Sequence, residues 1–492
     1  MLDRRQFIGG AAALGAAGLM GAPGTASGHG KHKHGKHGGG GKGLPKRETF
    51  VIRGAYVMSM DAAIGDVADG DVAVRDGRIV GVGRKLHGGR VIDGRGTIVM
   101  PGLIDTHWHL WTALHRSMAN SSPTNGYFAL NVRLGTQFQP DDYYQGARLA
   151  LAEALDSGIT TVHDWSHNIR GPKYADANLR AHQEVGLRGR FSYGTPQGHP
   201  ATQTIDLADF ERVHREWFRS GRLELVHLGL AGRPFGVAAD DVVRTEYETA
   251  RRLNLPVSYH ANSNRAQGQQ ANIQRLADAG MLGPHVQVIH ALFTTAAERQ
   301  ALVSTGTSVS TSPWSELLIG YGVTTVKELV DSGALVNFSV DTLPLTGNAD
   351  MFSIIKVAVG LHRGQSENEF SLLARRALAM ATIDAARGLG LDSVTGSLTP
   401  GKRADLIMVR ADALNIAPFT DAPNMIAFAA QPANVDTVAV DGRILKHDGR
   451  LTALDPRKVV KEASAALERV LDRAGGAGGA ARPENAHHFL CC

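Results

Sequence analysis

The middle of the chain alternates between two hydrophobic patterns. Short β-branched runs, such as Val257-Ser258-Tyr259 and Val286-Gln287-Val288-Ile289, are typical of buried strands. Between such runs lie amphipathic segments, such as residues 143–156 and 325–332, with apolar residues at helical spacing. Candidate strands fall at residues 103–109, 159–165, 189–194, 224–230, 256–260, 286–291, 307–312 and 336–341. This alternation predicts an α/β fold, a (β/α)8 TIM barrel over residues 99–393.

The segments on either side of the barrel region are patterned as short strands joined by tight turns. Asp-Gly pairs between β-forming residues favour hairpins, because both residues of the tight turn adopt positive φ. The first flank contains Asp76-Gly77-Arg78-Ile79 and Asp93-Gly94, and the second contains the similar phrase Asp441-Gly442-Arg443-Ile444. We therefore expect residues 48–98 and 394–455 to pair into one small composite β-sandwich.

The two ends of the chain have a different character. Asp3-Arg4-Arg5-Gln6-Phe7-Ile8 is a twin-arginine pattern, followed by a short Gly/Ala run and a small-residue cleavage site at Gly24-Thr25-Ala26-Ser27. We expect residues 1–27 to be a twin-arginine signal peptide that engages the Tat export machinery, with the enzyme periplasmic or secreted. The apolar run is too short for a stable membrane anchor. Residues 28–47 are interpreted as a flexible Gly/His/Lys-rich linker, and residues 456–492 as an amphipathic helix with a flexible tail.

Composition narrows the classes of function. The chain has 492 residues, 43% of them hydrophobic, which suffices for a large core and one minor domain. Its formal net charge of +5 comes largely from the linker, and the remainder is slightly acidic, which argues against a nucleic-acid partner. The only cysteines are Cys491 and Cys492, so no disulfide framework is expected.

Candidate metal ligands follow four of the predicted strands. His107 and His109 end the first strand at i and i+2, which places both imidazoles on one face. His260, His290 and Asp341 follow the fifth, sixth and eighth strands. The active site of a (β/α)8 barrel lies at the carboxyl ends of its strands, and neutral imidazole suits zinc and related ions. The pattern predicts a metal site there.

With these motifs the chain resembles a known family, the amidohydrolase superfamily. Within it, the resemblance is to the branch of cytosine-deaminase-like and triazine-hydrolase-like enzymes. The resemblance begins at Pro101-Gly102-Leu103-Ile104-Asp105-Thr106-His107-Trp108-His109 and includes the single histidines and the aspartate named above. Gly158-Ile159-Thr160-Thr161-Val162, Ser312-Pro313 and Gly396-Ser397-Leu398-Thr399-Pro400-Gly401 agree with it. It covers about residues 48–455.

The resemblance implies one divalent metal ion, with Zn²⁺ favoured over Fe²⁺ or Mn²⁺, held by His107, His109, His260 and Asp341. Such an ion makes hydroxide available near neutral pH. Asp341 would then be the catalytic base. His290 would polarise the substrate or orient the water, although a role as a fifth ligand stays open.

Two departures from the family pattern affect the expected reaction. Deaminases of this branch carry a proton-shuttling glutamate three residues after the fifth-strand histidine, where this chain has Ser263, which cannot carry a proton. Glu316, after the seventh strand, is a candidate substitute. The fourth strand has no lysine to bridge two ions, which favours a single ion, although His227 on that strand is an alternative ligand.

Aromatic and polar residues near the predicted barrel mouth are candidates for substrate contact. These are Trp111, His163, Gln197, Trp314 and Glu316. Aromatic walls with a few polar groups suit a flat heterocycle. His163 and His167 would form a second metal site only if their segment were helical.

Together these features predict an exported metal-dependent hydrolase that acts on C–N bonds of a small cyclic or heteroaromatic compound, by cyclic amide hydrolysis or deamination. One alternative is hydrolytic displacement of another ring substituent, as in dehalogenation, or decarboxylation. Another is a non-catalytic metal-dependent binder. The sequence leaves homo-oligomerisation open.

Overall fold

The computed structural model describes residues 43–475, apart from residues 121 and 324–325. The expected signal peptide, most of the expected linker and the tail beyond residue 475 lie outside the described residues. Within the described part of the chain, no helix is long and apolar enough to cross a membrane.

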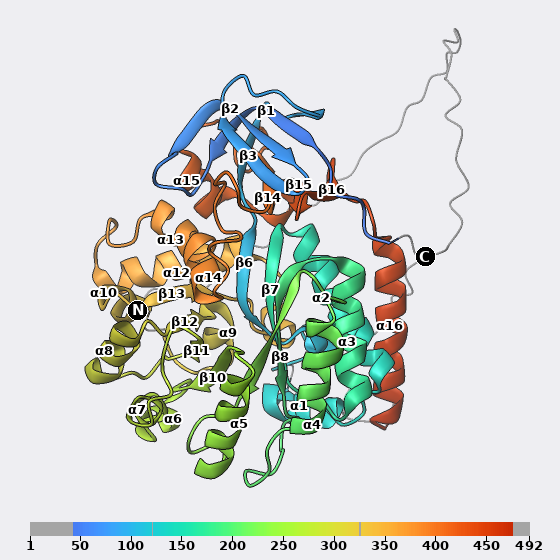
Figure 1. The fold of residues 1–492 in the computed structure, drawn as a ribbon. Helices are drawn as coiled ribbons and strands as arrows, with labels where there is room; N and C mark the ends of the chain where they lie inside the picture. The colour runs from blue at the N-terminus through green and yellow to red at the C-terminus, as the bar shows by residue number, and fades with distance from the viewer. Residues whose placement is uncertain (1–42, 121, 324–325, 476–492) are drawn as a thin grey trace, which may run out of the picture. The chain divides into compact units, whose positions relative to one another are not determined.

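The predicted barrel is confirmed. Eight parallel strands pair in chain order, and the register joins each strand to its sequence neighbours. They are β6 (Leu103–Trp108), β7 (Ile159–Ser166), β8 (Arg188–Gly194), β9 (Val226–Gly232), β10 (Val257–Ala261), β11 (Val286–His290), β12 (Ser308–Thr311) and β13 (Leu335–Phe338). The ring closes where Trp108 bridges Asp341, just after the last strand. Figure 1 shows helices packed around these strands.

The helices between the strands begin at recognisable signals. Pro140 starts the longest of the early helices, and a capping box joins Gln139 to Asp142. The α-helices of the barrel are α1 (Tyr127–Gly135), α2 (Pro140–Asp156), α3 (Pro172–Val185), α4 (Leu207–Val213), α5 (Asp240–Arg252), α6 (Arg265–Gln269), α7 (Asn272–Asp278), α8 (Ala296–Thr305), α9 (Pro313–Leu318), α10 (Val326–Asp331), α11 (Leu343–Thr346), α12 (Met351–Ser366), α13 (Ala374–Met380) and α14 (Ile383–Gly388). Shorter helical turns are η1 (Leu110–His115), η2 (Pro123–Asn125) and η3 (His214–Arg219).

The two flanks of the barrel form a second sheet, as expected. Its nine strands follow the order β17-β16-β15-β14-β5-β1-β2-β3, with β4 paired to β1. The strands are β1 (Phe50–Met58), β2 (Asp66–Arg75), β3 (Arg78–Gly83), β4 (Arg90–Asp93), β5 (Thr97–Pro101), β14 (Leu406–Arg410), β15 (Val435–Val440), β16 (Arg443–His447) and β17 (Arg450–Leu451). The antiparallel pairing of β5 with β14 joins the two flanks. Residues such as Phe50, Val72 and Met408 form its buried core.

The two similar Asp-Gly turns of this sheet pack against each other. Asp76-Gly77 joins β2 to β3, Asp441-Gly442 joins β15 to β16, and all four residues have positive φ. A Cβ added to Gly442 would lie 2.4 Å from the Cα of Gly77, so only glycine allows this approach. Asp93-Gly94 departs from the expected hairpin: neither residue has positive φ, and the chain continues from β4 into β5, both parallel to β1.

Four further helical segments complete the described chain. Three of them, α15 (Ala422–Asn424), η4 (Met425–Ala429) and η5 (Pro432–Asn434), precede β15, and α16 (Pro456–Arg473) follows β17. The last is the amphipathic helix that the sequence predicted. It lies along α2 (Figure 1), where Ala466 and Val470 pack in one apolar cluster with Trp111. Arg473 also forms an ion pair with the buried carboxylate of Asp142. The helix is therefore half-buried.

Candidate metal centre

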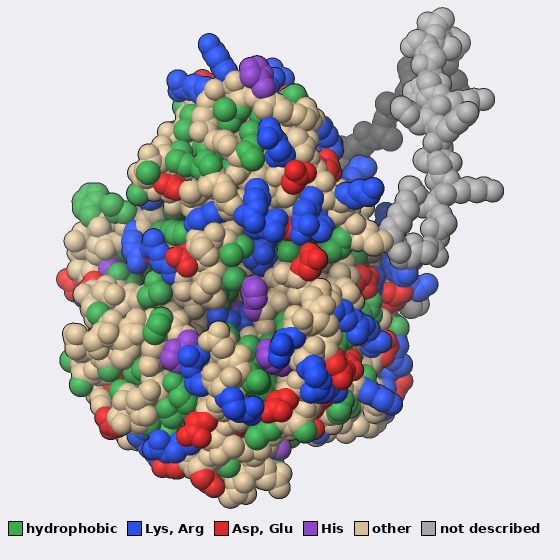
Figure 2. All heavy atoms as spheres, viewed as in Figure 1, with side chains coloured by type: hydrophobic (Ala, Val, Ile, Leu, Met, Phe, Trp, Pro, Cys, Tyr) green, Lys and Arg blue, Asp and Glu red, His purple; other side chains and the backbone are tan. Residues whose placement is uncertain are grey.

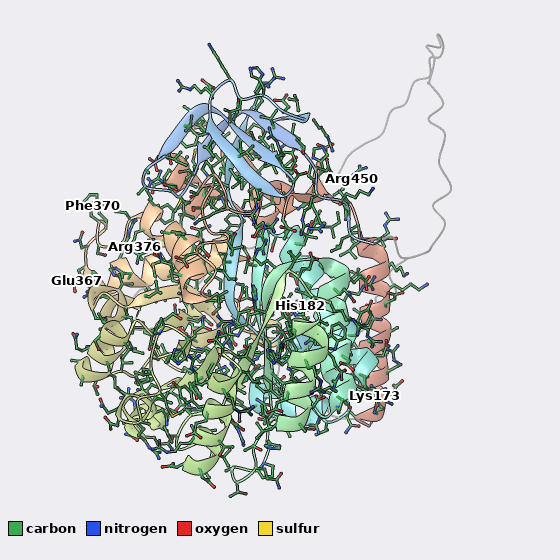
Figure 3. All side chains as sticks on the ribbon, viewed as in Figure 1. Lys173, His182, Glu367, Phe370, Arg376 and Arg450 are labelled. Atoms are coloured by element: carbon green, nitrogen blue, oxygen red, sulfur yellow. The ribbon has the colours of Figure 1, made fainter. Side chains whose placement is uncertain are left out.

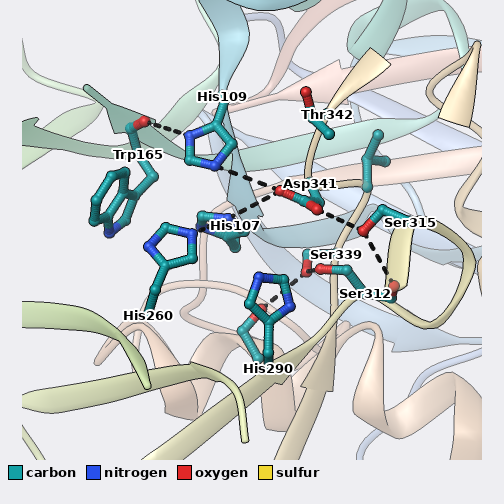
Figure 4. A network of polar contacts seen from close by, with 12 residues as sticks. His107, His109, Trp165, His260, His290, Ser312, Ser315, Ser339, Asp341 and Thr342 are labelled. Carbon is teal, nitrogen blue, oxygen red and sulfur yellow. Dashed lines mark hydrogen bonds and ion pairs between the residues drawn. The ribbon is translucent and has the colours of Figure 1, made fainter. Parts of the chain in front are cut away.

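The structure brings the five candidate side chains of the metal site together at the carboxyl ends of the strands. His107 and His260 approach each other with their Nε2 atoms 3.2 Å apart. Asp341 Oδ1 lies 3.2 Å from His107 Nε2 and 3.5 Å from His109 Nε2. His290 has a ring nitrogen within 4.8 Å of the ligand atoms of His107 and Asp341. Figure 4 shows these side chains facing a common point.

The backbone holds this arrangement at the barrel seam. Asp341 donates its N–H to the carbonyl of His107 at 3.0 Å, and His109 donates its N–H to the carbonyl of Asp341 at 2.8 Å. The buried carboxylate of Asp105 accepts the N–H of His107 at 3.0 Å and that of Val340 at 2.9 Å. A single side chain thus ties together the two strands that carry His107, His109 and Asp341.

Two of the five residues have left-handed backbones. His290 has φ of 73° and Asp341 has φ of 67°, a conformation that costs a non-glycine residue roughly 1–3 kcal/mol. His290 ends β11 and Asp341 comes just after β13, so the left-handed backbone interrupts the regular pleating at each position. Such strain persists where the surrounding structure fixes it, and it clusters at functional sites.

The charges around the cluster suit a cation. Burial, together with the neighbouring histidines, holds the pKa values of His107 and His260 well below the ordinary value, so both imidazoles are neutral. Neutral imidazole nitrogen and carboxylate oxygen are the donors that divalent zinc takes in proteins. His109 Nδ1 lies 3.0 Å from the carbonyl oxygen of Trp165, which orients that ring and leaves its Nε2 towards Asp341. The donor set therefore fits a divalent ion.

Glu316 is fully buried and faces His290. Its Oε1 lies 3.0 Å from His290 Nδ1 and accepts the N–H of Ser312 at 2.8 Å, whereas its Oε2 has no hydrogen-bond partner among the described residues. Burial alone would lower the pKa of His290, but the hydrogen bond and charge of Glu316, with the charge of Asp341, raise it overall. Asp341 is also held by a hydrogen bond from the same helix as Glu316: the hydroxyl of Ser315 donates to Asp341 Oδ2 at 2.5 Å.

The other candidates for substrate contact lie in different surroundings. Trp111 is buried in η1, where its Nε1 donates to Nδ1 of His167 at 3.4 Å. Gln197 follows β8 and has a buried Oε1 without a partner among the described residues. Trp314 is 39% exposed at the start of α9. His163 is not at the mouth, because both ring nitrogens contact interior groups: the carbonyl oxygen of Thr106 and the side chains of Gln287 and Ser192.

Two residues that the sequence places near the predicted barrel mouth, Trp165 and His167, lie beside the cluster. The rings of Trp165 and His260 lie 4.3 Å apart, and so do the rings of His167 and His109. Trp165 Nε1 and His167 Nε2 are buried and have no hydrogen-bond partner among the described residues. Trp165 ends the predicted run 159–165 and His167 lies two residues beyond it, which is the signal that locates them. The extension of β7 to Ser166 brings them to the site.

Two alternative metal arrangements do not form. His227 lies at the beginning of β9, paired in register with Arg190, at the opposite end of the strands from the cluster. The two histidines considered for a second metal site, His163 and His167, belong to a strand end rather than a helix and make separate contacts. Neither joins a potential metal-binding group among the described residues.

Comparison with known proteins identifies the family of the chain. The family model described as the amidohydrolase family matches residues 98–445, which covers the barrel and the strands that lead out of it. The chain belongs to the amidohydrolase family. It is therefore a metal-dependent hydrolase that acts on C–N bonds.

Known relatives match this amidohydrolase over nearly their whole length. The 5-methylthioadenosine/S-adenosylhomocysteine deaminase of Symbiobacterium thermophilum is 32% identical over 444 residues, covering 86% of this chain and 100% of that protein. The 5'-deoxyadenosine deaminase of Methanosarcina acetivorans is 29% identical over 438 residues, covering 86% and 99%. Among solved structures, atrazine chlorohydrolase of Arthrobacter aurescens TC1, complexed with zinc, has the same fold, with a TM-score of 0.77 at 22% identity; the match covers 85% of this chain and 100% of that one.

Proposed function

We propose that this amidohydrolase, loaded with one divalent ion such as zinc, deaminates a small amino-substituted heteroaromatic compound outside the cytoplasm. The observation that carries the proposal is the buried Glu316–His290 pair beside the cluster of three histidines and Asp341. It provides a proton donor where Ser263 cannot. The names of the relatives, deaminases of 5'-deoxyadenosine and of 5-methylthioadenosine/S-adenosylhomocysteine, support an aminopurine ring as the first choice.

Four side chains would hold the ion: His107, His109, His260 and Asp341. When bound, a divalent ion lowers the pKa of a water molecule to about 7 and polarises the substrate. Asp341 would accept the proton of the attacking water at the carboxylate oxygen that faces the histidines. The bond from Ser315 holds its other oxygen in place.

His290 would pass a proton to the substrate. Its Nδ1 contacts Glu316, which leaves Nε2 available on the side of the ligand cluster. In deamination a C–O bond forms, the C–N bond breaks, and the departing nitrogen must gain a proton to leave as ammonia. Ser263 carries no such proton, and its buried Oγ, unpartnered among the described residues, would instead hydrogen-bond the ring. Trp165 Nε1 and His167 Nε2 offer two further donors.

A second candidate reaction is hydrolytic displacement of another ring substituent, such as halide. The replacement of the usual glutamate by Ser263 favours it, because a halide leaves without a proton. The same side chains would bind and orient the ring, but Glu316 would then matter less to the rate than Asp341.

The test is a substrate panel with zinc-loaded protein: 5'-deoxyadenosine and S-adenosylhomocysteine, a cyclic amide, and a chlorinated triazine. We expect ammonia release from at least one aminopurine. Asp341→Asn should lower kcat/KM about 10³-fold or more, because the base and a ligand are lost together. Halide release alone would support displacement, and binding of the panel without turnover would support a non-catalytic protein.

We also propose that the enzyme is exported in the folded state by the twin-arginine route. The support is the sequence Asp3-Arg4-Arg5-Gln6-Phe7-Ile8, which lies outside the described residues, and the restriction of cysteine to Cys491 and Cys492. In a bacterial host with a functional Tat system, the full chain should appear in the periplasm or medium. The Arg4→Lys/Arg5→Lys variant should stay in the cytoplasm with unchanged specific activity, and equal export of both would contradict the proposal.

A further inference from the structure

A cavity of about 770 Å³ lies at the opposite end of the barrel from the metal cluster. It opens where three neighbouring strands begin, beside Arg190 on β8, His227 on β9 and Pro256 just before β10. Segments from η3 and from residues 389–391, after α14, complete its wall. Because the ligand cluster sits at the carboxyl ends of these strands, the cavity is distinct from the site proposed for catalysis.

The charges that line this cavity are predominantly positive. They are the guanidinium groups of Arg190, Arg219 and Arg251. The histidines His214, His227 and His285 also line the cavity, but burial lowers the pKa of each and favours the neutral ring. The only acid in the lining is Glu224, whose carboxylate lies 3.3 Å from Arg47. Figure 2 shows Lys, Arg and His side chains gathered around a recess near the middle of the face it presents.

Arg190 is a buried cation without a counter-ion. It is 6% exposed, and its Nη2 donates to the carbonyl of Leu389 at 2.7 Å, but no carboxylate among the described residues lies within ion-pair distance. Burial lowers its pKa to about 10. By contrast Arg188, two residues earlier, is paired with Asp405 at 2.5 Å. A buried charge that the protein leaves unpaired is costly unless a ligand completes it.

The other two arginines of the lining are also free of carboxylates among the described residues. Arg251 donates only to the carbonyl of Leu255, at 3.3 Å, and Arg219 is exposed at the end of η3. Apolar side chains form the rest of the wall, including Phe218, Leu223 and Leu391. An inorganic ion alone would leave this apolar wall and most of the volume unfilled.

We propose that this cavity binds a small organic phosphate, with the phosphoryl group against Arg190, Arg219 and Arg251 and an apolar body against the Phe218 side. Guanidinium groups match phosphate oxygens in geometry and stay charged at neutral pH. The site does not depend on the proposed deaminase activity, since none of its residues belongs to the metal cluster.

The probe is phenyl phosphate, titrated calorimetrically into zinc-loaded full-length protein at pH 7.5. The second pKa of a phosphate monoester is about 6, so the probe is a dianion at this pH. We expect millimolar or tighter binding, weaker binding of inorganic phosphate, and no measurable binding of phenol. Arg219→Gln and Arg251→Gln should each weaken phenyl phosphate about tenfold, as expected when a charge-assisted hydrogen bond is lost. Both side chains reach solvent, so neither substitution should unfold the chain.

Arg450→Gln is the matched control, because the substitution removes the same charge as the cavity variants do. Arg450 is exposed on β17 (Figure 3) and does not line the cavity. It should leave the affinity unchanged. The proposal is overturned if no binding occurs, if the cavity variants bind as tightly as the natural chain, or if His107→Ala abolishes binding. The last result would place the phosphate at the metal centre instead. Equal affinity for inorganic phosphate would overturn the organic part of the proposal.

Discussion

The buried contact between Glu316 and His290 is the residue-scale feature that most affects the expected chemistry. A serine at position 263 removes the proton carrier that the family resemblance implies, and the sequence offers Glu316 as a candidate substitute without placing it near the site. In the structure Glu316 has no exposed surface and contacts the ring of His290 rather than solvent. If Glu316 replaces the missing acid, as we propose, the acid lies on the helix after the seventh strand rather than at the end of the fifth.

Replacing Glu316 by glutamine should narrow the pH range of activity. Because the charge and hydrogen bond of Glu316 raise the pKa of His290 against the effect of burial, the variant should have a lower His290 pKa than the natural enzyme. If protonated His290 serves the leaving group, the alkaline limb of the kcat/KM profile moves to lower pH, by about one unit or more. The comparison uses the same metal in both proteins, so the effect of the ion cancels.

Glu298→Gln is the matched control for this prediction. Glu298 is also buried and follows a neighbouring strand, but it accepts from Asn262 Nδ2 at 3.0 Å instead of contacting His290. That variant should lose stability and keep the pH profile. An unchanged profile in Glu316→Gln would assign the proton to another group.

At the scale of elements, hydrophobic periodicity predicted the barrel strands well, because buried parallel strands leave a strong apolar signal. Where the strand boundaries differ from the predicted ones, the difference affects which side chains reach the metal cluster. The run at 224–230 becomes β9 at Val226–Gly232, so His227 lies near the strand's beginning and cannot join the cluster. Strand β7 extends one residue further, to Ser166. His163 contacts interior groups, whereas Trp165 and His167, further along the chain, lie against the metal cluster.

The side chains that lie beyond the strand ends, in loops and helix caps, could not be placed from the sequence. Strand ends locate metal ligands because the barrel brings all carboxyl ends together. The direction of side chains beyond a strand depends on local backbone, as the positive φ of His290 and Asp341 shows. Trp111 illustrates the limit: the apolar cluster in which it is buried includes residues of α16, from the far end of the chain. The ligand roles themselves stay predictions.

At the scale of the whole molecule, the cluster joins strands that are far apart in sequence. His107 and His109 come from the first barrel strand, His260 from the fifth, and Asp341 follows the eighth. The eighth and first strands meet through the Trp108–Asp341 bridge and a few hydrogen bonds rather than a long ladder. An ion coordinated by all four residues would strengthen the barrel at this seam.

Metal removal should therefore destabilise the folded protein measurably. A ligand that binds only the native state adds RT ln(1 + [L]/Kd), about 4 kcal/mol at a thousandfold excess over Kd, which for a chain of this size raises Tm by several degrees. Calorimetry of chelated protein should give a lower Tm, restored by zinc. His107→Ala should have the lower Tm with or without added zinc, because it lacks a ligand from the first strand. A chelated protein that melts with the zinc-loaded one would show that the cluster does not hold an ion in the folded barrel.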